Sequence, residues 1–154
     1  MKVLNKLMIG AAALTLLTGC SLLQQKVSYE KFHEKAVAAH DKGHSYVKAV
    51  LNGTMEASGM SIKFEKLEYT YASGVWQAKD SSVAAYAGAM IVGTEAISVT
   101  DEEGQTYYVG NGFKVTMKDD DGTGTAVFNA AGLMTSMKTT ADNGKMNVTV
   151  KYSK

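Results

Sequence analysis

Residues 113–152, FKVTMKDDDGTGTAVFNAAGLMTSMKTTADNGKMNVTVKY, decide the fold because apolar residues recur in them at every second position. The alternating runs are Phe113, Val115 and Met117, then Leu133, Thr135 and Met137, then Met146, Val148, Val150 and Tyr152. The positions between them carry mainly Lys, Thr, Ser and Asn. A period of two with one apolar face is typical of an antiparallel sheet that is solvated on one side.

Turn signals separate these runs and continue upstream of them. They fall at 101–104 (DEEG), 111–112 (NG), 119–124 (DDDGTG), 130–132 (AAG) and 142–144 (DNG). Short runs joined by such turns pair with their neighbours in the sequence. The spacing therefore predicts a meander of about five or six strands from Ile97 to the C-terminus.

A second strand-rich stretch lies upstream, between residues 46 and 71. Its first part, from Tyr46 to Met55, is expected to be broken by Asn52-Gly53. The alternation of Met60, Ile62 and Phe64 then slips by one place before Leu67, Tyr69 and Tyr71 continue it. A slip of one residue predicts a β-bulge near Glu65-Lys66.

Two stretches have a helical period. The first runs from Ser28, a suitable N-cap, to about Lys42, with Gly43 as its stop signal and Tyr29, Phe32, Ala36 and Ala39 on one stripe. The second covers Ser81 to about Ala96. The predicted fold class is α+β, with a large curved antiparallel sheet of about seven or eight strands, mostly a meander. The N-terminal and middle helices are expected to pack on one of its faces.

The N-terminus, MKVLNKLMIGAAALTLLTGC, has the form of an export signal. Lys2 and Lys6 precede an apolar run, Met8 to Leu17, that is too short to be a permanent membrane span. The run ends in Leu17-Thr18-Gly19-Cys20, which resembles the lipobox of bacterial lipoproteins, and Cys20 is the only cysteine. An ordinary cleaved secretory signal is the alternative interpretation.

The lipobox resemblance implies a division of the chain and a location. Residues 1–19 would be a signal peptide, 20–27 the acylated Cys20 and a tether, and 28–154 a single α+β domain. Removal of residues 1–19 from 154 leaves 135, enough to bury a core without disulfides. The protein would be lipid-anchored in the cell membrane or outer membrane and face out of the cytoplasm.

Composition and motifs exclude several classes of function. Of the 16 basic residues two lie in the signal, which leaves 14 Lys against 15 acidic residues, with no Arg, so nucleic-acid binding is not expected. The chain has no phosphate-binding glycine loop and no nucleophile motif. We therefore expect no cofactor and no enzymatic activity.

Two groups of metal-ligand residue types are present, and neither has a metal-site pattern. His33, His40 and His44 have helical spacing, but Gly43 interrupts them and no Cys or carboxylate completes a set, so a solvated helix face is favoured and a zinc or copper site is the weaker option. The acidic run 119–124 lacks the EF-hand spacing and predicts a hairpin turn. No metal ligands are assigned.

Methionine and aromatic residues are the candidate ligand-binding groups. The part after the signal contains seven methionines, Met55, Met60, Met90, Met117, Met134, Met137 and Met146, and unbranched thioether side chains suit an adaptable apolar cavity. The predicted contacts are Met60, Phe64, Trp76, Met90, Phe113, Met117, Phe128 and Met137. The alternative is that these residues only fill the core.

The predicted order of elements is similar to that of the LolA/LolB and LppX-type lipoprotein carriers. In these, an open antiparallel half-barrel holds acyl chains beneath helices; the segment 127–133 (VFNAAGL) is loosely similar to their later strands. The resemblance implies a non-enzymatic lipoprotein that binds a lipid or another apolar ligand. The alternative is a cell-envelope interaction or inhibitor module with a filled core, whose partner is a protein.

Overall fold

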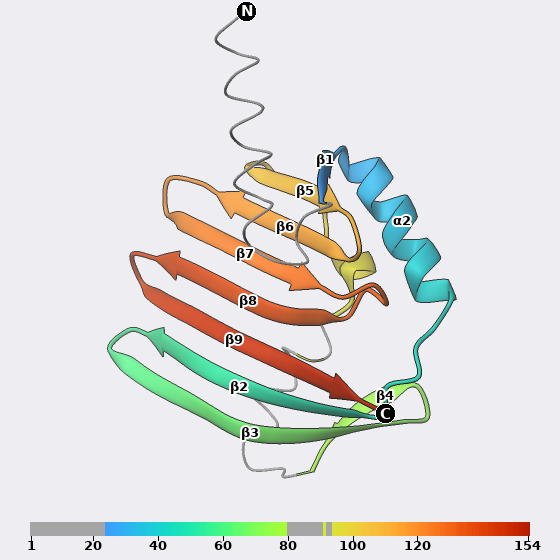
Figure 1. Cartoon of the computed structure of the whole chain (residues 1–154). Coiled ribbons are helices and arrows are strands. Elements are labelled where there is room, and N and C mark those ends of the chain that lie inside the picture. Colours follow the sequence, from blue (N-terminus) through green and yellow to red (C-terminus); the bar gives the residue numbers. More distant parts are fainter. Residues whose placement is uncertain (1–23, 80–90, 92–93) are drawn as a thin grey trace, which may run out of the picture.

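The computed structural model describes residues 24–79, 91 and 94–154, and these contain one nine-stranded antiparallel sheet (Figure 1). Its order is β1-β5-β6-β7-β8-β9-β2-β3-β4. The strands are β1 (Gln25–Val27), β2 (Lys48–Ala57), β3 (Met60–Ala72), β4 (Val75–Ala78), β5 (Gln105–Val109), β6 (Phe113–Lys118), β7 (Gly122–Phe128), β8 (Met134–Ala141) and β9 (Gly144–Ser153). The α+β class with a large antiparallel sheet is confirmed, with nine strands where about seven or eight were predicted.

The predicted meander is present as β5 to β9, each strand pairing with the next. One further strand pairing, which the sequence pattern did not reveal, extends the sheet beyond β9. The last strand, β9, pairs with β2 over its whole length, from Lys48 opposite Ser153 to Ala57 opposite Gly144. The early hairpin β2–β3 therefore extends the meander, and all of these strands share one core face.

The predicted break at Asn52-Gly53 is wrong, because β2 runs through it without interruption. Gly53 lies so close to β9 that an added Cβ atom would sit 2.3 Å from the carbonyl oxygen of Asn147. The glycine here permits a close approach of two backbones and does not end the strand.

The predicted β-bulge at Glu65-Lys66 is confirmed. The β2–β3 register shifts there, since two residues of β3 lie opposite Asn52 alone. Lys66 takes a positive φ of 50°, and its backbone N–H donates to Asn52 Oδ1 at 2.9 Å. The extra residue keeps Phe64 and Leu67 on the same face of the sheet.

The N-terminal helix α2 (Tyr29–Asp41) also matches its prediction. Ser28 caps it, its hydroxyl oxygen accepting from the N–H of Lys31 at 3.4 Å, and Gly43 follows its end with a φ of 65°. The buried residues Phe32, Ala36 and Ala39 belong to the predicted stripe.

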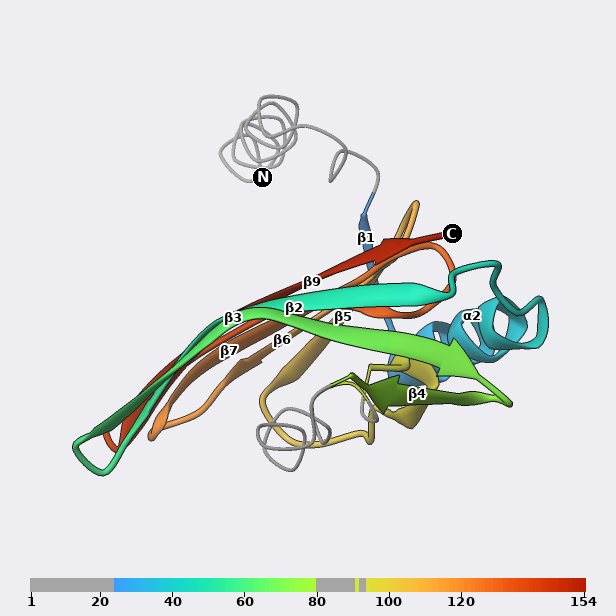
Figure 2. The same ribbon diagram turned by 90° about the horizontal axis from the view of Figure 1, so that it is seen from below.

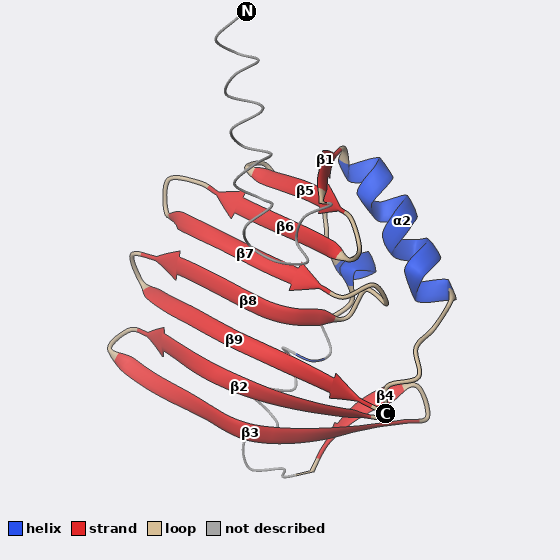
Figure 3. Cartoon of the chain, in the orientation of Figure 1, coloured by secondary structure: helices blue, strands red, loops and turns tan. Residues whose placement is uncertain are grey.

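The predicted middle helix, Ser81 to about Ala96, lies mostly outside the described residues. Ile91, a described residue inside this range, is α-helical. The predicted end is not: Glu95 forms a bridge with Leu133, and Ala96–Ser98 is a short 3₁₀ helix, η1. The backbone of this segment bonds to the turn between β7 and β8, because Ala96 N–H donates to the Gly132 carbonyl at 2.7 Å. Among the elements with described bounds, α2 is the α-helix (Figure 3).

The segment assigned as a tether is partly structured. Gln25–Val27 forms strand β1, which pairs with Val109 to Tyr107 of β5. The signal segment, Cys20 and residues 21–23 of the tether lie outside the described residues. No helix in the described ranges has the length and apolarity needed to cross a bilayer.

The sheet is bent, and α2 and β4 lie on its concave side (Figure 2). Phe32 of α2 is fully buried against this face, its ring 5.3 Å from that of Tyr107 and 5.7 Å from that of Phe113. Ala49, Leu51, Phe64, Met134 and Val148 are the fully buried residues that the described strands contribute to the concave face. The core therefore lies on the concave face, where α2 covers the part near β5 and Ile91 and Ala96 are also buried.

Candidate ligand-binding face

Four apolar side chains, with a glycine and a threonine between them, lie in a cross-strand row on the concave face, toward the ends of the strands that lie away from α2. Strand register places Met117, Gly124, Thr139, Met146, Met55 and Ile62 side by side across six strands. We call this set the methionine row. All six residues are partly exposed. Side chains of adjacent strands on one face lie about 5 Å apart, so Met146, Met55 and Ile62 form a continuous apolar strip, and Gly124 and Thr139 separate it from Met117.

The methionine row is continuous with the core. The next row toward α2 is Val115, Ala126, Met137, Val148, Gly53 and Phe64. Val115, Val148 and Phe64 are buried there, whereas Ala126 and Met137 are partly exposed. The concave face therefore changes from closed core to partly open apolar surface over about two residues of each strand. Three flexible thioether side chains line the open part, a composition that suits an apolar ligand of variable shape.

The opposite face of the same strands is polar. Directly beside Met55 and Met146 in the sequence, Thr54 and Asn147 pair with each other and are exposed. This difference between the two faces is what the alternation predicted, and it identifies the concave face as the side on which an apolar ligand would lie.

Three of the predicted ligand contacts come together here. Met117 belongs to the methionine row, and Phe64 and Met137 belong to the row beside it. Phe113 and Phe128 also share the concave face, paired with each other. They are only 5% and 4% exposed, and Phe113 packs against Phe32 of α2, so they are core residues in this structure.

The remaining predicted contacts lie elsewhere. Met60 is 68% exposed in the β2–β3 turn region, where it lines a shallow pocket with Ser58 and Asn143. Trp76 of β4 belongs to an aromatic cluster, its ring 5.0 Å from that of Tyr71 and 5.6 Å from that of Tyr152. Met90 lies outside the described residues.

The list of predicted contacts omitted Met55, Met146 and Ile62, which are half of the methionine row. Met146 begins one alternating run and Ile62 lies in another, so the sequence places each of them on the apolar face of its own strand. The signal that was missing is the pairing of β2 with β9, which places Met55 opposite Met146.

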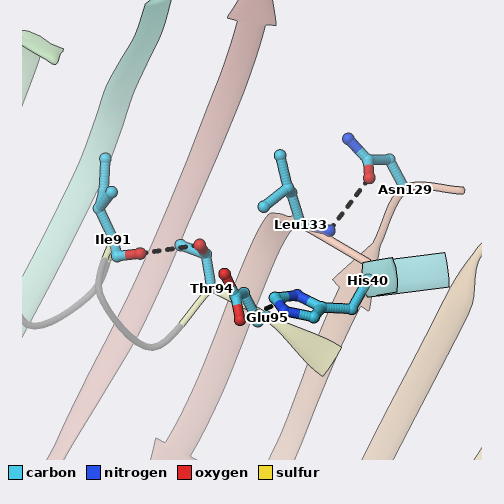
Figure 4. Close-up of polar contacts among 6 residues, drawn as sticks. All are labelled: His40, Ile91, Thr94, Glu95, Asn129 and Leu133. Atoms are coloured by element: carbon cyan, nitrogen blue, oxygen red, sulfur yellow. Dashed lines mark hydrogen bonds and ion pairs between the residues drawn. The ribbon is translucent and has the colours of Figure 1, made fainter. Parts of the chain in front are cut away.

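The three histidines do not converge. His40 lies on α2, with Nδ1 3.3 Å from Glu95 Oε2 (Figure 4). His44 follows the helix end and stacks 5.9 Å from Trp76, and its Nδ1 is buried without a hydrogen-bond partner. His33 lies 5.6 Å from Tyr29. In the part of the chain that the structure describes, no three His, Cys, Asp or Glu side chains are grouped to hold a metal.

Within the run 119–124, Asp119, Asp120 and Asp121 form the predicted turn between β6 and β7, and residues 122–124 already belong to β7. Asp119 Oδ1 accepts from the backbone N–H groups of Asp121 at 3.0 Å and Gly122 at 2.8 Å. The carboxylate closes its own turn, which is the common use of Asp at such positions.

Comparison with known proteins adds no identification: no family model matches the chain, and no curated protein matches it.

Proposed function

We propose that this protein is a membrane-anchored extracytoplasmic lipoprotein, without enzymatic activity, that binds a lipid or another apolar ligand on the concave face of its sheet. The observation that carries the proposal is the partly exposed methionine row and its continuity with the core. Covering such a strip removes apolar surface from water at about 25 cal/mol per Å². A ligand that covers it therefore gains affinity without any specific polar contact.

The anchor is proposed from the N-terminal sequence. A basic start, a short apolar run and Leu17-Thr18-Gly19-Cys20 together resemble a lipoprotein signal. Acylation at Cys20 would tether the domain through a short segment that leads into β1. The ligand-binding face would then work close to the membrane surface, where acylated molecules are abundant.

The alternative, an envelope interaction module, would be favoured by an exposed aromatic patch over a filled core. The large hydrophobic residues that are exposed in the described part of the chain are Val47, Met60 and Val75, and none of them is aromatic. The methionine row therefore favours ligand binding over this alternative.

The proposed ligand binding is tested by titration with an environment-sensitive apolar fluorescent probe. The full chain, purified in mild detergent and exchanged into amphipol, should raise the fluorescence of the probe to saturation. Added fatty acid should then displace the probe. A non-saturating signal equal to that of amphipol alone would contradict the proposal.

The proposed anchor is tested by metabolic labelling in a bacterial host. Cells that express the full chain with labelled palmitate should incorporate label into it, because acylation of Cys20 attaches fatty acyl groups. Cys20→Ser should remove the label and release the protein from the membrane fraction, whereas Ser21→Ala should change neither. Equal labelling of the wild-type chain and Cys20→Ser would contradict the assignment.

A further inference from the structure

Tyr69 of β3 carries a buried hydroxyl group that has no hydrogen-bond partner within residues 24–79, 91 and 94–154. The side chain is only 3% exposed and lies on the concave face. Most buried polar groups in proteins are hydrogen-bonded, because leaving one unpaired costs the full desolvation of that group. The hydroxyl of Tyr69 is therefore a donor for which the described part of the chain supplies no acceptor.

Other tyrosine hydroxyls near the core do have acceptors. Tyr107 donates to Asp101 Oδ1 at 2.7 Å, Tyr152 to the Met134 carbonyl at 2.7 Å and Tyr29 to the Val99 carbonyl at 3.1 Å. Burial, together with the hydrogen bond to Asp101, raises the pKa of Tyr107 to about 12. These three hydroxyls thus donate hydrogen bonds to groups of the protein itself, whereas no such bond is found for the Tyr69 hydroxyl among the described residues.

The residues that pair with Tyr69 across the sheet are small. Its cross-strand neighbours are Ala49 on β2 and Ala78 on β4, whose side chains are too short to reach the hydroxyl. Burial raises the pKa of Tyr69, so the hydroxyl remains a neutral donor at physiological pH. Along β3, Leu67 and Phe64 connect Tyr69 to Ile62 of the methionine row on the same face, about 20 Å away at the rise of a strand.

We infer that the Tyr69 hydroxyl donates a hydrogen bond to a carbonyl oxygen of the bound lipid, so that the ligand is an acyl ester or amide and not a plain hydrocarbon. The inference rests on the proposed function and assigns the polar contact that the methionine row lacks. In an apolar site, one neutral hydrogen bond to an otherwise unpaired donor corresponds to a preference of about tenfold for the carbonyl-containing ligand.

The test compares two ligands of similar length, methyl dodecanoate and tridecane, by displacement of the apolar probe from the full chain in amphipol. The wild-type chain should bind the ester about tenfold more tightly than the alkane. Tyr69→Phe should abolish this preference and leave alkane binding unchanged. Tyr152→Phe, which removes a hydroxyl whose acceptor is internal, should retain the preference.

The possible failures are distinguishable. If the wild-type chain binds neither ligand, the proposed function fails, and the inference fails with it. If it binds both and Tyr69→Phe keeps the ester preference, only the inference is overturned. Without ligand, Tyr69→Phe should leave the melting temperature unchanged or raise it, whereas Tyr152→Phe should lower it. A clear drop for Tyr69→Phe would show an internal partner and overturn the inference.

Discussion

Placing a charge pair in the methionine row, by Met55→Lys with Met146→Glu, is expected to abolish binding of the apolar probe. The two residues lie directly opposite each other on β2 and β9, so the introduced charges pair across the strands. Ligand binding would have to desolvate these charges and would lose two thioether contacts. A loss of about 3 kcal/mol or more corresponds to an affinity reduced by more than about 100-fold.

The matched control moves the same charge pair to the opposite face of the same strands. Thr54→Lys with Asn147→Glu alters the adjacent, exposed pair of residues. We expect this variant to bind the probe like the wild-type chain. Both variants should keep the circular dichroism spectrum of the sheet, because the changed positions are at least partly exposed. If both variants lose binding equally, or if neither loses it, the ligand does not lie on the concave face.

Truncating Phe32 to alanine is expected to give the largest loss of stability. Its side chain is fully buried and joins α2 to the sheet through the rings of Tyr107 and Phe113. Removal of a buried phenylalanine leaves a cavity and costs about 3–5 kcal/mol, a large fraction of the stability of an ordinary domain. Chemical denaturation should show the midpoint shifted strongly to lower denaturant concentration.

The control for this substitution lies one residue away on the same helix. Lys31 is exposed, so Lys31→Ala should change the free energy of unfolding by no more than about 0.5 kcal/mol. A Phe32→Ala variant as stable as Lys31→Ala would mean that α2 does not close the core.

Much of the fold could be predicted because local chemistry decides it. The alternation in 113–117 and 146–152, the cap at Ser28 and the slip at Glu65-Lys66 each act within a few residues, and each matches the structure. The predicted run of Leu133, Thr135 and Met137 is wrong, because Thr135 is the extra residue of a β-bulge that pairs Met134 with Phe128. The pairing of β9 with β2 could not be predicted, since it joins segments almost 100 residues apart and leaves no local signal. Gly53 was misinterpreted for the same reason: it accommodates the distant backbone of Asn147.

The candidate site was less predictable than the fold. Residue type alone favoured Phe113 and Phe128, but packing of α2 against this part of the face makes them core residues. Met55 and Met146 become neighbours only through the long-range register. The missing acceptor at Tyr69 could not be predicted, because it depends on every group that surrounds a buried hydroxyl.

The most direct test of the central claim is native mass spectrometry of the full chain after purification from a bacterial host, followed by solvent extraction of whatever is bound. The account predicts a species heavier than the chain by the mass of a lipid, and solvent extraction should release that lipid. The double variant Met55→Lys with Met146→Glu should not show the heavier species. A spectrum that contains only the bare chain, together with no uptake of added fatty acids or phospholipids, would contradict it.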